Sequence, residues 1–182
     1  MPSGGNVRGL RLAVVGAALC LAVPLVAAEP RPAEYVVKAA FLYNFARFAE
    51  WPTARDPDAP LIICVLGEDP FGEALEGLAG GTVRGQKIAV RRAARSTEVE
   101  PCDILFISAS EAPHLAELLP RYGSEPILTV SDIARFAESG GIVQLTMSGN
   151  RVRFRVNVAA AGRAGIRLSA KLLRLGEVVD DS

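Results

Sequence analysis

The chain has 182 residues, with 20 basic residues, 20 acidic residues, one His, three Cys and an apolar share of 50%. This length accommodates one domain, and the apolar share is large enough for a true core, which excludes global disorder and collagen-like or Cys-dense scaffolds. The formal net charge of zero removes the usual electrostatic argument for a nucleic-acid-binding protein.

The first 28 residues have the pattern of a secretory signal peptide. Arg8 and Arg11 precede an apolar run over residues 12–26, and small residues lead up to Ala28. We therefore expect cleavage near Ala28, export to the periplasm, and a single mature domain over residues 29–182. An uncleaved membrane anchor is the alternative. Leu19 before Cys20 argues against a lipoprotein, because lipidation requires a small residue at that position.

The charges of the remaining chain are unevenly distributed. Residues 29–138 carry 17 acidic and 11 basic residues, whereas residues 139–182 carry three acidic and seven basic ones. Such a dipolar molecule could dock onto a partner by complementarity of charge. A solvated basic face is the alternative interpretation.

Export also changes how the cysteines are interpreted. Cys64 and Cys102 remain after removal of the signal peptide, in a compartment that permits disulfides. A bridge between them would stabilise the fold by roughly 4 kcal/mol on the chain-entropy estimate. Two buried free thiols are the alternative, and the absence of a neighbouring His argues against a metal site.

The mature chain alternates between helical and strand patterns. A helix is expected over residues 33–50, ended by Trp51-Pro52, with one face at Val37, Ala40, Phe41, Asn44 and Phe48. Further apolar residues surround this helix, which indicates burial on most sides, in the core or against another chain. Strands are expected over residues 61–66, 87–91, 103–107 and 126–130, and helices over residues 73–78, 110–121, 131–138 and 164–175.

Near the C-terminus, residues 142–147 and 152–158 have the pattern of a hairpin. In its second strand the basic residues Arg151, Arg153 and Arg155 alternate with apolar ones, so one face is expected to be packed and the other basic. The order of elements predicts an α/β fold: a three-layer α/β/α sandwich around a mostly parallel sheet, with an antiparallel hairpin at its C-terminal edge.

No catalytic motif stands out in the sequence. His114 is the only His, and the Gly67–Gly72 segment lacks the residues of a phosphate-binding loop. We therefore expect neither an enzyme nor a bound cofactor or metal. A hydrolase that uses Ser108, Ser110 and His114 is kept as an alternative.

Several ordered blocks resemble the YfiR/HmsC-like periplasmic family over about residues 34–176. They include Lys38-Ala39-Ala40-Phe41-Leu42-Tyr43-Asn44-Phe45, Asp69-Pro70-Phe71-Gly72, Cys102-Asp103-Ile104-Leu105-Phe106-Ile107, Leu128-Thr129-Val130-Ser131-Asp132, Gly140-Gly141-Ile142 and Leu172-Leu173-Arg174-Leu175.

The resemblance implies a non-enzymatic repressor. Members of this family bind the periplasmic sensor portion of an inner-membrane diguanylate cyclase and hold it inactive, which lowers cyclic di-GMP and biofilm formation. The resemblance also implies a homodimer and a disulfide between Cys64 and Cys102. The family's second cysteine pair is missing, because Ser131 to Gly141 contains no Cys.

The expected partner-binding residues are Phe136 and Gly140 as an apolar anchor and its turn, Arg151, Arg153 and Arg155 as a charged rim, and Asn157 as a bridge between chains. The structural alternative for Phe136 is packing of a helix on the sheet. For the three arginines it is a solvated strand face, and for Asn157 it is the hydrogen bonding of a strand end. A second functional hypothesis is a periplasmic sensor of a small ligand that acts on another membrane signalling protein, with a pocket near Gly67 or Ser108 at the carboxyl ends of the strands.

Overall fold

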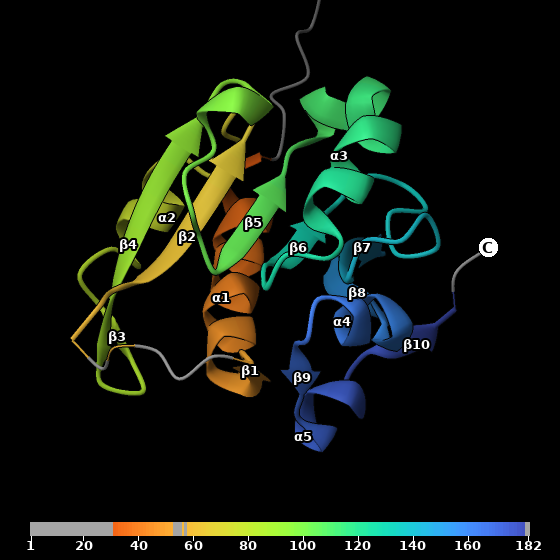
Figure 1. The fold of residues 1–182 in the computed structure, drawn as a ribbon. Coiled ribbons are helices and arrows are strands. Elements are labelled where there is room, and N and C mark those ends of the chain that lie inside the picture. The colour runs from red at the N-terminus through yellow and green to blue at the C-terminus, as the bar shows by residue number, and fades with distance from the viewer. Residues whose placement is uncertain (1–30, 53–55, 57, 181–182) are drawn as a thin grey trace, which may run out of the picture.

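A computed structural model of the chain describes residues 31–52, 56 and 58–180 (Figure 1). The expected signal peptide lies outside these residues. Within the described ranges, we find no helix whose length and hydropathy would let it span a bilayer.

Eight strands form one mixed sheet, in the order β10-β8-β7-β6-β5-β2-β4-β3. The strands are β2 (Leu61–Leu66), β3 (Thr82–Val83), β4 (Gln86–Ala93), β5 (Ile104–Ile107), β6 (Leu128–Ser131), β7 (Val143–Ser148), β8 (Arg151–Asn157) and β10 (Glu177–Val179). Two further short strands, β1 (Ala49–Glu50) and β9 (Arg167–Leu168), pair with each other in antiparallel orientation outside this sheet.

The helices differ greatly in length. They are α1 (Arg31–Phe48), α2 (Glu73–Glu76), α3 (Leu115–Tyr122), α4 (Val158–Arg163) and α5 (Ala170–Leu173), with 3-10 turns η1 (Ser96–Glu98) and η2 (Ala109–His114). Figure 1 shows α1 running along the sheet as the longest helix, with α3 on the side nearer the viewer.

The sheet is mostly parallel, which confirms the predicted α/β class. The pairs β2–β4, β2–β5, β5–β6, β6–β7 and β8–β10 are parallel, whereas β7–β8 and β3–β4 are antiparallel. The expected hairpin is present as β7 and β8. Its position at the sheet edge was wrong, because β10 adds a further strand beside β8.

Alternate residues of the central strands enter two separate apolar cores. Ile63 and Phe106 belong to the core that includes α1, α2, α4 and α5, and Leu66 and Leu105 belong to the core that includes α3. Every residue of β5 and β6 is buried. This double-sided burial explains why β2 and β5 are continuous apolar runs in the sequence.

The buried face of α1 differs from the face expected from the sequence. Ala39, Leu42, Phe45 and Ala46 are buried in the core. Val37 and Ala40, by contrast, are exposed, and Phe41 is only half-buried. Apolar residues occur around most of this helix, so periodicity alone did not determine its rotation.

A buried charge lies on the core side of α1. Lys38 is 3% exposed, and its Nζ atom lies 2.6 Å from Oδ2 of Asp132, directly after β6. The hydroxyl of Tyr35 donates to the same oxygen at 2.8 Å, and Glu34 forms a second ion pair with Lys38. Because a buried ammonium group is stable only when it is paired, this contact ties the first half of α1 to the end of β6.

The expected helix over residues 131–138 is a series of turns instead. Arg135 adopts a left-handed φ of 61°, which a continuous right-handed helix does not tolerate. The hydroxyl of Ser131 accepts from the Ile133 N–H and donates to the Ile107 carbonyl, so it closes a local turn and links β6 to β5.

The single helix expected over residues 164–175 was also wrong, because this region contains β9 and only one short helix, α5, while α4 ends before it at Arg163. Gly165 has a φ of 68° and interrupts the helical path after α4. The Ser169 hydroxyl then accepts from the Leu172 N–H and starts α5 as a new helix.

The buried ion pair yields a test of stability. We expect Asp132→Asn to lower the free energy of unfolding by about 3 kcal/mol, because it removes the more buried of the two carboxylates that pair with the Lys38 ammonium group. Glu50→Gln removes a partner of exposed Arg167 and should cost less than about 1 kcal/mol. Chemical denaturation of both variants measures the difference, and equal losses would contradict this role of Asp132.

Candidate functional site

A groove lies between α1 and the β7–β8 hairpin, next to the predicted basic strand. Its cavity has a volume of about 760 Å³. We call it the hairpin groove, and it is lined by Ala33, Glu34, Val37, Phe41, Met147, Asn150, Arg151, Val152 and Arg153.

The apolar side of the hairpin groove comes from two elements that are far apart in sequence. Val37 and Met147 are each 45% exposed. Phe41 lies one helical turn after Val37, and its ring contacts the ring of Phe154 from β8 at 5.6 Å between centroids. The groove therefore rests on an aromatic base that belongs to the core.

The polar side of the groove confirms one part of the sequence interpretation. Arg151 and Arg153 are exposed and line the groove, whereas Phe154 and Val156 point into the core. The alternation of basic and apolar residues in this strand therefore separates two faces, as predicted. The residues that line the groove therefore combine apolar side chains with two exposed arginines.

Arg155, the third arginine of this strand, has a different structural role. Its guanidinium pairs with the Glu138 carboxylate and with Glu177 of β10 at 3.2 Å. The pKa of Glu138 is lowered, first by its own backbone N–H and then by Arg155. This network joins the turn after β6, β8 and β10, so Arg155 is engaged within the chain.

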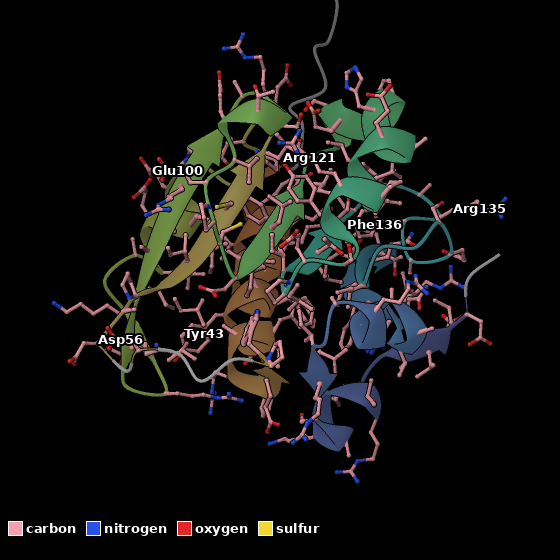
Figure 2. The ribbon with its side chains drawn as sticks, viewed as in Figure 1. Tyr43, Asp56, Glu100, Arg121, Arg135 and Phe136 are labelled. Carbon is pink, nitrogen blue, oxygen red and sulfur yellow. The ribbon has the colours of Figure 1, made fainter. Side chains whose placement is uncertain are left out.

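Two of the expected contact residues are enclosed in the fold. Phe136 is completely buried, and Figure 2 shows it inside the molecule, below α3, whereas the neighbouring Arg135 points outward. Asn157 is also completely buried: its amide donates to the Ala137 carbonyl at 2.8 Å, and its Oδ1 accepts from Ala160 at the start of α4. In this conformation neither side chain can contact a partner, because their own chain covers them.

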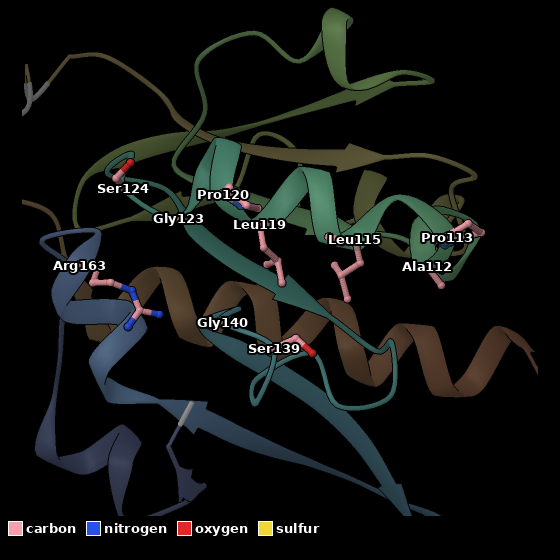
Figure 3. A pocket seen from close by; sticks show the side chains of 11 residues that line it. Ala112, Pro113, Leu115, Leu119, Pro120, Gly123, Ser124, Ser139, Gly140 and Arg163 are labelled. Carbon is pink, nitrogen blue, oxygen red and sulfur yellow. The ribbon is translucent and has the colours of Figure 1, made fainter. Parts of the chain in front are cut away.

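Gly140 lies away from the hairpin groove, in a second cavity beside α3. Its φ of 106° is one that side-chain-bearing residues rarely adopt. The structure therefore separates residues that we expected at one interface. Arg151 and Arg153 line the hairpin groove, whereas Gly140 lines the cavity beside α3 (Figure 3).

The two cysteines lie together under α3. Both are buried thiols of the same apolar core, Cys64 in β2 and Cys102 just before β5. Contact with the Cys102 thiol lowers the pKa of Cys64, whereas the same contact and burial raise the pKa of Cys102 well above its usual range. A small cavity of about 250 Å³, lined in part by Arg91 and Glu100, also borders Cys64.

The residues of the hydrolase alternative have separate partners. Ser110 accepts a hydrogen bond from the Glu68 N–H at 3.0 Å, and the exposed His114 lies 3.4 Å from the Glu111 carboxylate. The crevice expected near Gly67 is occupied, because a Cβ placed on Gly67 would lie 2.4 Å from the Ser110 hydroxyl. Ser108 is buried beside it. Among the described residues, no group of three or more His, Cys, Asp or Glu could hold a metal ion.

Comparison with protein-family models gives a match over residues 35–177, and the matching model is described as YfiR/HmsC-like. The chain belongs to this family. The family is regulatory and acts in cyclic di-GMP signalling, which supports a regulator rather than an enzyme at the level of the family. It also implies, in general terms, an interaction with a membrane sensor or cyclase.

The buried ion pair connects two of the sequence blocks that the chain shares with this family. Lys38 and Asp132 belong to two of the sequence blocks that indicated the resemblance, and they are 94 residues apart in the chain. Their contact shows that these blocks meet in space beside the carboxyl end of β6.

Sequence reasoning did not identify Met147 as a candidate and assigned Val37 and Phe41 to a buried face. The available signal was the excess of apolar residues around α1, which left burial against another chain as one of two interpretations. The pairing of α1 with the hairpin could not be derived from either segment alone.

The proximity of the two thiols leads to a test of the disulfide, which stays a prediction. We expect protein taken directly from the periplasm to incorporate no alkylating reagent until it is reduced, as measured by intact mass. The Cys102→Ser variant is the control: in denaturant it should incorporate one reagent molecule without reduction, because Cys64 is buried in the fold and has no cysteine partner left to form the bridge. Incorporation of two molecules by unreduced wild-type protein would contradict the bridge.

Proposed function

We propose that this protein is exported to the periplasm, where it binds the sensor portion of an inner-membrane diguanylate cyclase through the hairpin groove and holds the cyclase inactive. The family match supports a regulator of cyclic di-GMP signalling. The observation that carries the choice of surface is the exposure of Val37 and Met147 on two elements that line one groove with Arg151 and Arg153.

The groove has the composition of a protein-binding surface. Aromatic residues, Met and Arg are enriched at protein interfaces, and an apolar centre with a charged rim is their common arrangement. Phe41 and Met147 supply the apolar centre, and the two arginines supply the rim. The net positive charge of residues 139–182 favours a partner surface with an excess of Asp and Glu.

Repression requires that the regulator bind the inactive form of the cyclase more tightly than the active form. A thousandfold preference corresponds to about 4 kcal/mol of differential affinity. Burial of the exposed parts of Val37 and Met147 supplies roughly 1 kcal/mol each. The remainder has to come from the arginines and the other groove residues, so the partner must match both the apolar centre and the charged rim.

The order of events follows from this arrangement. Binding lowers the population of the active cyclase without any covalent step, because a ligand shifts an equilibrium by its differential affinity alone. Release of the regulator restores the synthesis of cyclic di-GMP. Homodimerisation, which the family resemblance implies, stays a prediction beside this mechanism.

The test compares groove variants with a matched variant elsewhere. Val37→Asp and Met147→Asp place a charge at exposed apolar positions and should leave the fold intact, while they weaken binding to the purified periplasmic domain of the cyclase at least tenfold. The control is Val178→Asp on β10, an apolar residue that is 54% exposed and does not line the groove. It should bind like the wild type.

Isothermal titration measures these affinities, and the cyclic di-GMP content of cells reports repression. In cells the groove variants should raise cyclic di-GMP toward the level of a deletion strain. Binding of both groove variants with wild-type affinity, or an equal loss in the Val178→Asp control, would contradict the assignment of the groove. Affinity should also fall with added salt, because charged rims are screened.

A further inference from the structure

A polar cavity lies at the carboxyl ends of β5 and β6, beside the first half of α1. Its volume is about 420 Å³, which is within the range of small-molecule sites. Glu34 and Lys38 of α1, Ala109 and Asp132 from the segments that follow β5 and β6, and Gln144 of β7 line what we call the strand-end cavity. In open α/β sheets, ligands commonly bind at this edge, outside the carboxyl ends of the parallel strands.

The Asp132 carboxylate has one oxygen with partners and one without. Its Oδ2 atom accepts from the Lys38 ammonium group at 2.6 Å and from the Tyr35 hydroxyl at 2.8 Å. Its Oδ1 atom is buried and has no hydrogen-bond partner among the described residues. The side chain as a whole is 10% exposed, so solvent compensates this oxygen poorly. Because an unpaired acceptor in the interior is unfavourable, a donor supplied by a ligand would be favoured there.

The charged side chains of the strand-end cavity leave one negative charge uncompensated. Glu34 and Asp132 both pair with Lys38, which is the only basic side chain among the described residues that line the cavity. Two carboxylates therefore face one ammonium group. Since charges interact strongly in a poorly solvated site, this balance favours a cation and disfavours an anion.

The remaining wall of the cavity is apolar. It is lined by the aliphatic side chains of Ala109, Ala134, Leu145 and Met147. Leu145 is buried in the core, which fixes its position, whereas Ala109 and Ala134 are exposed. A ligand that fits this cavity therefore combines a charged head with a short apolar body, because this wall offers no side-chain hydrogen bonds to a wholly polar ligand.

We propose that the strand-end cavity binds a small primary alkylammonium ion, with its charged head at the carboxylates of Asp132 and Glu34 and its alkyl chain along Leu145 and Met147. An ammonium group carries three donors and no acceptor, so it supplies the hydrogen bond that Oδ1 lacks and adds no unpaired acceptor of its own. Glu34 is the more accessible of the two carboxylates. The ammonium group reaches Oδ1 of Asp132 by a rotation of the carboxylate about its last torsion, which is soft.

The strand-end cavity adjoins the hairpin groove, because Glu34 and Met147 line both. The inference nevertheless goes beyond the proposed function and does not depend on it, since binding of an alkylammonium ion is measurable on the purified protein alone. A failure to bind this ion would leave the assignment of the groove in place, and a failure of the groove to bind the cyclase would leave the cavity in place.

Pentylammonium is a suitable probe, since it joins one primary ammonium group to a short alkyl chain. We expect saturable binding at 1:1 stoichiometry in isothermal titration of the purified protein. Pentanoate, which combines a similar apolar chain with the opposite charge, separates charge recognition from apolar adsorption. It should bind at least tenfold more weakly, because its carboxylate would face two carboxylates in the cavity.

Variants of the two carboxylates test the assigned contacts. Glu34→Gln should weaken the affinity for pentylammonium at least threefold. The matched control Glu50→Gln removes an exposed carboxylate that follows α1 and does not line the cavity, so it should bind like the wild type. Asp132→Asn should abolish binding, and circular dichroism under the titration conditions reports whether this variant is folded.

A cavity-filling variant keeps the test decisive if Asp132→Asn does not fold. Ala134→Trp introduces a large ring from an exposed position, leaves the ion pairs of Lys38 in place and should abolish binding by occupying the cavity. The absence of saturable pentylammonium binding, equal affinity for pentanoate, or wild-type affinity in Glu34→Gln or Ala134→Trp would each overturn the proposal.

Discussion

The ion pair between Lys38 and Asp132 constrains how α1 lies on the sheet. Lys38 is the charged residue on the buried side of the helix, and its ammonium group is stable there because Asp132 and Glu34 accept from it. This contact and the apolar residues Leu42 and Phe45 turn the same side of α1 toward the core. Val37 then has to point away from that core, next to the β7–β8 hairpin.

The exposed surface of the molecule follows from this rotation. With Val37 and part of Phe41 outside the core, α1 and the hairpin enclose a groove whose apolar centre is bordered by Arg151 and Arg153. The family to which the chain belongs acts in signalling, and a regulator needs an accessible surface more than a reactive group. The groove supplies that surface.

The sheet was predictable from the sequence because its central strands are buried on both sides. Runs such as 61–66 and 103–107 contain almost no polar residue, and the turn segment 148–151 between two strand patterns identified the hairpin. The rotation of α1 was not predictable, since apolar residues surround the helix and the partner of Lys38 lies 94 residues away. The turn after β6 escaped prediction because it depends on a left-handed Arg135, a conformation that propensity does not signal.

Hydroxyl-radical footprinting of the complex tests the central claim most directly, because it reports the exposure of individual side chains. In the free protein, Phe41, Met147 and Leu175 should all be oxidised, in keeping with their partial exposure. On addition of the periplasmic domain of the cyclase, the account predicts protection of Phe41 and Met147, while Leu175 stays reactive. Protection of Leu175 with unchanged oxidation of Phe41 and Met147 would contradict it.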